Sequence, residues 1–89
     1  MFKPFETQED RLKLLNLLSR SGYKVRMHAY EYFVRDRYFV AFIHLMPSNR
    51  LAVIRGFRWN LEEFKDNVER LKSLIKHIDP DVKIEIQIG

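Results

Sequence analysis

The stretch Tyr38-Phe39-Val40-Ala41-Phe42-Ile43-His44-Leu45-Met46 decides how the rest of this chain can fold. It contains no Asp, Glu, Lys or Arg and consists mainly of aromatic, β-branched and other apolar residues. Such residues favour a buried pleated surface, and a strand that is apolar on both faces is typical of the middle of a sheet. We therefore predict that residues 38–46 form the central strand.

Turn residues on both sides of this stretch define its neighbours. Pro47-Ser48-Asn49 has the chemistry of a turn, and residues 50–57 form the next predicted strand, which ends near Gly56. On the other side, a turn at Arg35-Asp36 precedes the central strand.

Residues 23–30 alternate between polar and apolar, which predicts a first strand with two different faces. The expected apolar face holds Val25, Met27, Ala29 and, further along, Phe33; the expected polar face holds Lys24, Arg26, His28, Tyr30 and Tyr32.

A helix is predicted before these strands, over residues 7–20. Thr7 is its expected N-cap, with Asp10 at the capping-box position. Gly22 is the expected C′ residue.

A second helix and a last strand follow the meander. Asn60, with Glu63 three residues later, is the expected N-cap, and Asp79-Pro80 ends the helix. Its apolar positions recur at intervals of three and four residues: Leu61, Phe64, Val68, Leu71, Ile75 and Ile78. Residues 82–88 then alternate as a half-buried strand.

The predicted order of elements is therefore α-β-β-β-α-β. Two amphipathic helices need a sheet face to cover, which predicts an α+β fold: a two-layer sandwich in which an antiparallel meander carries both helices on one face. The length of 89 residues fits a single domain over residues 1–89. The place of the last strand in the sheet stays open.

One-sided coverage leads to a first functional hypothesis. The uncovered face of the central strand would show one of two apolar sets: Tyr38, Val40, Phe42 and Met46, or Phe39, Ala41, Ile43 and Leu45. Soluble monomers rarely expose such a patch. The chain could thus be a protein-interaction module or a small inhibitor-type regulator that forms a homodimer through this face.

Positive charge is concentrated in the strand region. The chain has 16 Lys and Arg against 12 Asp and Glu, a net charge of +4. Residues 11–58 hold ten of the basic residues, eight of them Arg, but only two acidic ones, Glu31 and Asp36. Guanidinium groups bind phosphate oxygens in bidentate fashion and stack on bases.

These Arg residues are interleaved with tyrosines, and the mixture suits phosphates and unpaired bases. Our main hypothesis is therefore a small basic protein, regulatory in role, that binds DNA or RNA. An ordinary solvated strand face is the alternative. The predicted binding residues are Arg26, Tyr30, Tyr32, Arg35, Arg37, Arg55 and Arg58.

His28 and His44 carry a third hypothesis. With a three-residue hairpin loop they would face each other on adjacent strands, and two histidines near Arg could cleave RNA by general acid–base catalysis. No third residue in the sequence orients either ring, so we expect a protein that is not an enzyme.

Other functional classes lack their residues. The chain has no cysteine, and its three histidines lack a ligand spacing, so we expect no metal site. The three glycines form no phosphate-binding loop, and we expect no cofactor and no small-molecule substrate. No apolar run is long enough to span a membrane and no signal peptide is apparent, so we expect a cytoplasmic protein with no membrane partner.

Overall fold

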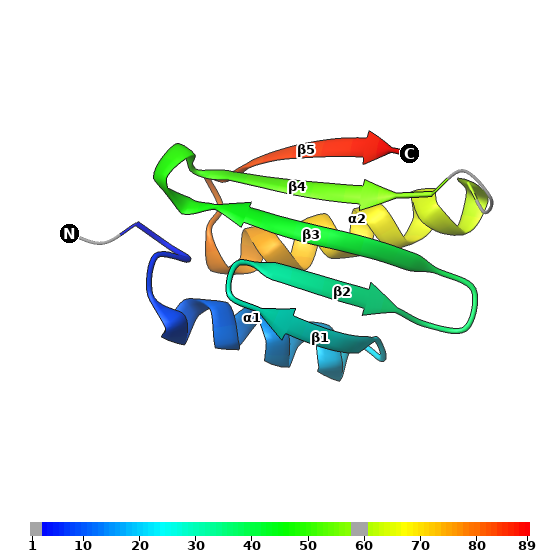
Figure 1. Cartoon of the computed structure of the whole chain (residues 1–89), viewed down its shortest axis with the longest axis horizontal. Coiled ribbons are helices and arrows are strands. Elements are labelled where there is room, and N and C mark those ends of the chain that lie inside the picture. The colour runs from blue at the N-terminus through cyan, green and yellow to red at the C-terminus, as the bar shows by residue number, and fades with distance from the viewer. Residues whose placement is uncertain (1–2, 58–60) are drawn as a thin grey trace.

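The computed structural model describes residues 3–57 and 61–89. Within these residues, two α-helices and five strands follow one another in the order α-β-β-β-β-α-β (Figure 1). Their bounds are α1 Gln8–Arg20, β1 Lys24–His28, β2 Glu31–Arg35, β3 Val40–Met46, β4 Leu51–Gly56, α2 Leu61–Ile78 and β5 Lys83–Ile88, with a short 3-10 helix, η1, at Pro47–Asn49.

The strands form one sheet in which the spatial order, β1-β2-β3-β4-β5, is also the sequence order. Neighbours from β1 to β4 are antiparallel, whereas β5 is parallel to β4. A parallel pair needs a crossover connection, and α2 provides it. The prediction of a central strand is confirmed, because β3 lies in the middle. The last strand takes the outer position beside β4.

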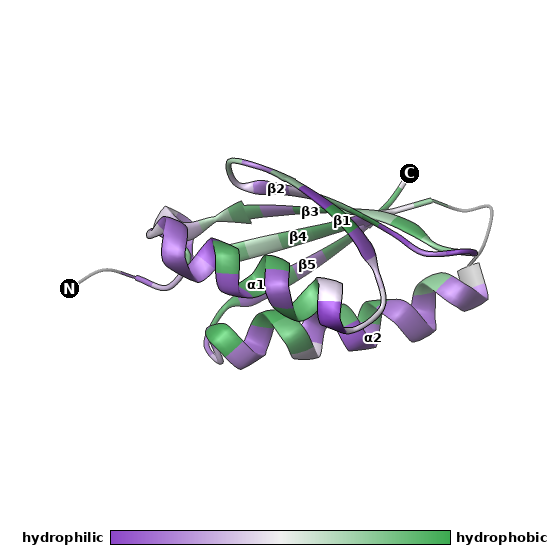
Figure 2. Cartoon of the chain, turned by 90° about the horizontal axis from the view of Figure 1, so that it is seen from below, coloured by the Kyte–Doolittle hydropathy of each residue, from purple (hydrophilic) through white to green (hydrophobic). Residues whose placement is uncertain are grey.

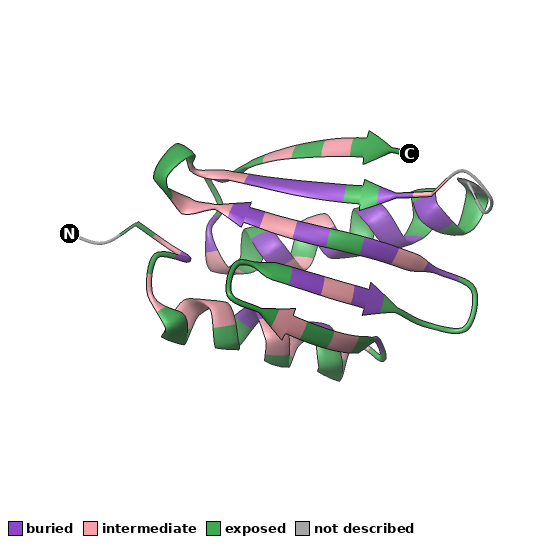
Figure 3. Ribbon diagram, viewed as in Figure 1, coloured by how far each residue is buried: buried purple, intermediate pink, exposed green. Residues whose placement is uncertain are grey.

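Both helices pack on the same face of the sheet, which confirms the predicted α+β two-layer architecture (Figure 2). Five strands span about 19 Å at about 4.8 Å per gap, and two helices of about 10 Å diameter cover that width. Figure 3 marks the buried residues of the sheet and the helices, and the buried apolar ones among them form one core. Its fully buried members include Leu14 and Leu18 of α1, Ala41 and Ile43 of β3, Ile54 of β4, and Leu71 and Ile75 of α2.

Residues 24–35 form a hairpin, so the prediction of one continuous strand through Tyr30 and Phe33 is wrong. His28 pairs with Glu31, which leaves Ala29 and Tyr30 as a two-residue turn. Ala29 has a φ of 55°, a region that favours Gly or Asn. The chain therefore turns at a position that carries no sequence signal for a turn.

This turn reverses the faces that the sequence predicted for Tyr32 and Phe33 of β2. A two-residue turn places His28 and Glu31 on the same face, and the alternation then continues from Glu31. Tyr32 and Val34 consequently face the helices, and Phe33 faces away from them.

The ends of α1 agree with the sequence prediction. The Thr7 hydroxyl accepts a hydrogen bond from the Asp10 backbone N–H at 3.3 Å. At the other end, Gly22 has a φ of 99° and follows the C-cap Ser21. The predicted cap of α2, Asn60, and the side chain of Leu61 lie outside the described residues.

A glycine lets α2 approach the sheet closely. Gly56 ends β4 beneath the ring of Phe64, and a Cβ at that position would collide with this ring. Phe64 also stacks with Phe39 at a centroid distance of 6.1 Å. The start of the crossover helix is thus fixed against both β4 and the segment before β3.

An ion pair with a buried carboxylate fixes the other end of the crossover. The side chain of Asp79 is 1% exposed and accepts hydrogen bonds from Arg50, at 2.7 Å from Nη2 and 3.0 Å from Nε. These bonds lower the pKa of Asp79 and outweigh burial, which raises it. The pair connects the residue before β4 with the end of α2, and so stabilises the parallel β4–β5 arrangement.

Replacing Ala29 by Gly should stabilise the protein, because glycine adopts a positive φ without the steric cost of a Cβ. We expect a gain of about 0.5–1 kcal/mol in the free energy of unfolding. Thermal unfolding followed by circular dichroism measures it. Gly at Arg26, in the middle of β1, is the control and should destabilise; a loss of stability at both positions would contradict the turn assignment.

The Asp79→Asn variant should show how the ion pair depends on pH. Because the folded pKa of Asp79 is lowered, its carboxylate stabilises the fold fully above its unfolded pKa of about 3.9, and this contribution is lost as the pH falls through the folded pKa. In urea unfolding, the stability gap between wild type and variant should be the same at pH 7 and 5 and smaller at pH 3. A gap that stays constant down to pH 3 would show that the charge of Asp79 is not what stabilises the fold.

Candidate nucleic-acid interface

No described element lies over the face of the sheet opposite the helices, which we call the open face. Figure 1 views this face, with both helices behind the sheet. Phe39, Ala41, Ile43 and Leu45 are buried on the helix side, so β3 presents the other apolar set outward. The open face consists of Lys24, Arg26 and His28 of β1, Glu31, Phe33 and Arg35 of β2, Val40, Phe42, His44 and Met46 of β3, Leu51, Val53 and Arg55 of β4, and Lys83, Glu85 and Gln87 of β5.

Aromatic rings occupy the middle of the open face. Phe33 and Phe42 are cross-strand partners whose ring centroids lie 5.1 Å apart at an interplanar angle of 50°. Phe57, just after β4, meets the edge of Phe42 at 6.1 Å. Phe42 remains 40% exposed, so its ring is in contact with solvent rather than with the core.

Two guanidinium groups flank these rings in the same row. Arg26 pairs with Phe33 across β1 and β2, and Arg55 pairs with Phe42 across β3 and β4. We call Arg26, Phe33, Phe42 and Arg55 the aromatic row, which runs at right angles to the strands. Further positive charge lies beside it, because Lys24 pairs with Arg35 in the next row.

The row on the other side of the aromatic row contains no Arg or Lys. His28 pairs with Glu31, Glu31 with His44, His44 with Val53, and Val53 with Glu85. Its two carboxylates, and two histidines that carry charge only when protonated, contrast with the guanidinium groups nearby. On the open face, the two carboxylates therefore lie in the row next to the aromatic row, and most of the basic residues lie in the aromatic row and beyond it.

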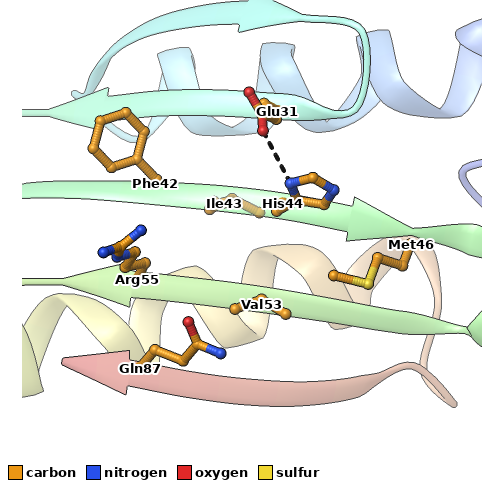
Figure 4. Close-up of a pocket in the computed structure, with 8 residues that line it drawn as sticks. All are labelled: Glu31, Phe42, Ile43, His44, Met46, Val53, Arg55 and Gln87. Atoms are coloured by element: carbon orange, nitrogen blue, oxygen red, sulfur yellow. Dashed lines mark hydrogen bonds and ion pairs between the residues drawn. The ribbon is translucent and has the colours of Figure 1, made fainter. Parts of the chain in front are cut away.

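A shallow depression of about 380 Å³ lies where these two rows meet on β3 and β4 (Figure 4). The Glu31 carboxylate contacts Nδ1 of His44 at 3.0 Å at its border. Arg55 and Gln87 point toward it from neighbouring strands. Its lining is Glu31, Phe42, Ile43, His44, Met46, Val53, Arg55 and Gln87.

The two histidines are not on adjacent strands, so the three-residue loop that would bring them together is absent. His28 lies on β1 and His44 on β3, with Glu31 of β2 between them. The sequence prediction also missed that Glu31 is the group that orients His44. Only the pairing register, set by the unforeseen hairpin, reveals this contact.

Three of the predicted binding residues do share one surface. Arg26, Arg35 and Arg55 are exposed on the open face, from three different strands. Arg37 lies apart from them, in the loop between β2 and β3, with its guanidinium 5.7 Å from the ring of Tyr38. Arg58 falls outside the described residues.

Neither of the two tyrosines predicted to stack on bases lies on the open face. Tyr32 is fully buried, so the expectation that its ring is exposed is wrong. Its hydroxyl donates a hydrogen bond to the Arg11 carbonyl at 2.7 Å, and burial raises the pKa of this hydroxyl. Tyr30 is exposed in the β1–β2 turn, with the Arg11 guanidinium 4.2 Å from its ring centroid.

Phe33 and Phe42 were absent from the predicted site although they form its centre. Both lie in apolar stretches, and an apolar residue on a strand indicates core unless the covered face is known. The signal that existed was the uncharged β3 sequence, which is apolar on both faces while the helices cover only one.

Within residues 3–57 and 61–89, no three His, Asp or Glu side chains are grouped in a way that could hold a metal ion. Neither helix in this part of the chain has the length and apolar character of a membrane span.

Comparisons with protein-family models, curated proteins and solved structures give no match for this chain.

Tyr32→Phe tests the structural placement of that tyrosine. The substitution removes one hydrogen bond to the Arg11 carbonyl and should lower the free energy of unfolding by about 1 kcal/mol. It should leave the affinity for any nucleic acid unchanged, because the ring does not reach the surface. Urea unfolding and fluorescence anisotropy on the same preparation check both results. A weaker affinity with unchanged stability would instead mean that Tyr32 contacts a ligand.

Proposed function

We propose that this protein binds single-stranded nucleic acid on the open face of its sheet. The aromatic row carries the proposal: two adjacent phenylalanine rings lie between two arginines in the middle of an uncovered surface. The charge distribution of the sequence adds support, because the basic residues of the strand region outnumber the acidic ones.

The phenylalanines supply the binding surface for bases. Stacking of a base on an aromatic side chain contributes about 1–3 kcal/mol and depends little on which base is bound. The rings of Phe33 and Phe42 are tilted by 50° to each other, so each offers a stacking surface of different orientation. Two consecutive unpaired bases match this pair.

The arginines at the two ends of the row suit the phosphates. A chain that crosses the strands along the aromatic row meets Arg26 at one end and Arg55 at the other. Lys24 and Arg35 add positive charge on the side away from the acidic row. Guanidinium groups bind phosphate oxygens in bidentate fashion, so the row favours a backbone that follows it.

Two features favour a single strand over a duplex. Bases in a duplex are stacked on each other and have no face left for Phe42, whereas unpaired bases do. Glu31 and Glu85 lie in the row next to the aromatic row and would repel the second strand's phosphates. The basic residues lie only in the aromatic row and in the row of Lys24 and Arg35 on its other side.

The depression beside Phe42 suits the edge of a stacked base. Arg55 and Gln87 supply hydrogen-bond donors, Gln87 and Glu31 supply acceptors, and Phe42 borders them with an apolar ring. This combination lets a base that stacks on Phe42 form hydrogen bonds with its edge. A protein partner on the same apolar surface is the second hypothesis, favoured by the exposure of Phe42.

Phe42→Ala should weaken binding of a short single-stranded DNA or RNA by about 1–3 kcal/mol, roughly fivefold to 150-fold. Phe42→Tyr, which keeps a ring, should retain most of the affinity. A paired change of Arg26 and Arg55 to Gln should reduce the slope of log affinity against log salt by about 1.4, or about 0.7 for each lost phosphate contact. Fluorescence anisotropy between 50 and 300 mM salt measures both effects.

Arg20→Gln with Lys65→Gln is the matched control, since it removes the same charge from the helix layer. It should leave both the Phe42 effect and the salt slope of single-strand binding unchanged. Affinities weaker than about 100 μM for every nucleic acid at the lowest salt would be no better than non-specific binding. That result would reject the proposal in favour of a protein partner on the open face.

A further inference from the structure

β1 and β5 are the two edge strands of the sheet (Figure 1). Each has a strand neighbour within the sheet on one side only. Such edges pair readily with other strands unless something prevents it. Like charges protect β1, because Lys24 and Arg26 both lie on its open-face side. Pairing β1 with a second copy would bring these groups together.

The β5 edge has no comparable protection. Its open-face side carries Lys83, Glu85 and Gln87, whose charges are mixed, and the strand contains no proline. Ile84, Ile86 and Ile88 alternate with them on the helix side, and Ile88 is 45% exposed.

The backbone of β5 is arranged to accept another strand. The N–H groups of Lys83 and Gly89 donate to the carbonyls of Arg50 and Gly56, so the odd-numbered residues are bonded to β4. Because peptide groups alternate in direction along a strand, those of Ile84, Ile86 and Ile88 point away from the sheet.

An apolar groove of about 440 Å³ runs beside this edge, between β5 and α2. Phe64, Val68, Ile86 and Ile88 contribute its apolar surface, while Lys65, Asp66 and Glu69 of α2 stand at its border. The border thus carries one basic and two acidic side chains, so a copy related by a two-fold axis can set Lys65 against an acidic group.

We propose that two copies of this chain associate by antiparallel pairing of β5 about a two-fold axis at Ile86. In this register the outward peptide groups of Ile86 bond to those of Ile86 in the second copy. Ile88 lies opposite Ile84, which covers the exposed isoleucine. Glu85 lies opposite Gln87, so no two like charges are paired. A register centred on Glu85 would set that carboxylate against itself.

The dimer would have one continuous sheet of ten strands. A two-fold axis perpendicular to the sheet keeps both sets of helices on one side and both open faces on the other. Each copy would keep its own aromatic row accessible. This inference is therefore independent of the ligand and goes beyond the proposed binding of nucleic acid.

Two substitutions of Gln87, one to an acidic and one to a basic residue, test the β5–β5 register centred on Ile86. Gln87→Glu sets a carboxylate against Glu85 twice across the axis and should raise the dimer dissociation constant about tenfold. Gln87→Lys creates two attractive pairs at the same positions and should lower that constant. Sedimentation equilibrium measures the constant, with the wild type expected at twice the 10.8 kDa chain mass.

Gln8→Glu on α1 is the matched charge control and should leave the constant unchanged, and circular dichroism verifies that each variant folds. A wild type that stays monomeric at several hundred micromolar overturns the proposal. So does a dimer that responds to neither Gln87 variant but dissociates in Phe42→Asn, since that dimer would use the open face.

Discussion

Two helices can cover only one face of a five-stranded sheet, and the other features of this molecule depend on that limit. β3 is apolar on both sides, so the helices bury Ala41, Ile43 and Leu45 and leave Phe42 facing solvent. The pairing register then brings Phe33 and two arginines to the exposed ring. The candidate site follows from the uneven coverage of an apolar strand.

Aromatic residues have roles opposite to those that their chemistry suggests. Tyr32, with a polar hydroxyl, is in the core because the Arg11 carbonyl accepts its hydrogen bond. Arg11 is likewise a structural residue, since its guanidinium donates to the carbonyls of Phe5 and Glu6 and lies against Tyr30. Phe33 and Phe42, without any polar group, are at the surface. A fixed polar partner makes burial of the tyrosine favourable, whereas the phenylalanines are exposed because no element covers them.

The two edge strands of the sheet, β1 and β5, differ in the charge of their side chains and in what they could bind. β1 carries only basic groups and His on its open-face side, which suits an anionic ligand and opposes pairing with a copy. β5 carries mixed charge beside an apolar groove, which suits a second copy and contributes only Gln87 to the depression beside Phe42. Association at β5 and binding at the aromatic row would therefore use surfaces that meet at one residue.

The sequence by itself determined the helices, the central strand and the α+β class, because these depend on local periodicity and on caps such as Thr7 and Gly22. It could not determine the turn at Ala29, because strand pairing there overrides a poor local propensity for a turn. The turn changes the alternation of side chains by one residue, so Tyr32 and Phe33 lie on the faces opposite to those predicted. Arg26, Arg35 and Arg55 could be predicted for the site because arginine side chains without an ion-pair partner are rarely buried. Phe42 and the edge position of β5 were decided only by the tertiary structure, since both depend on which face and which edge the rest of the chain leaves uncovered.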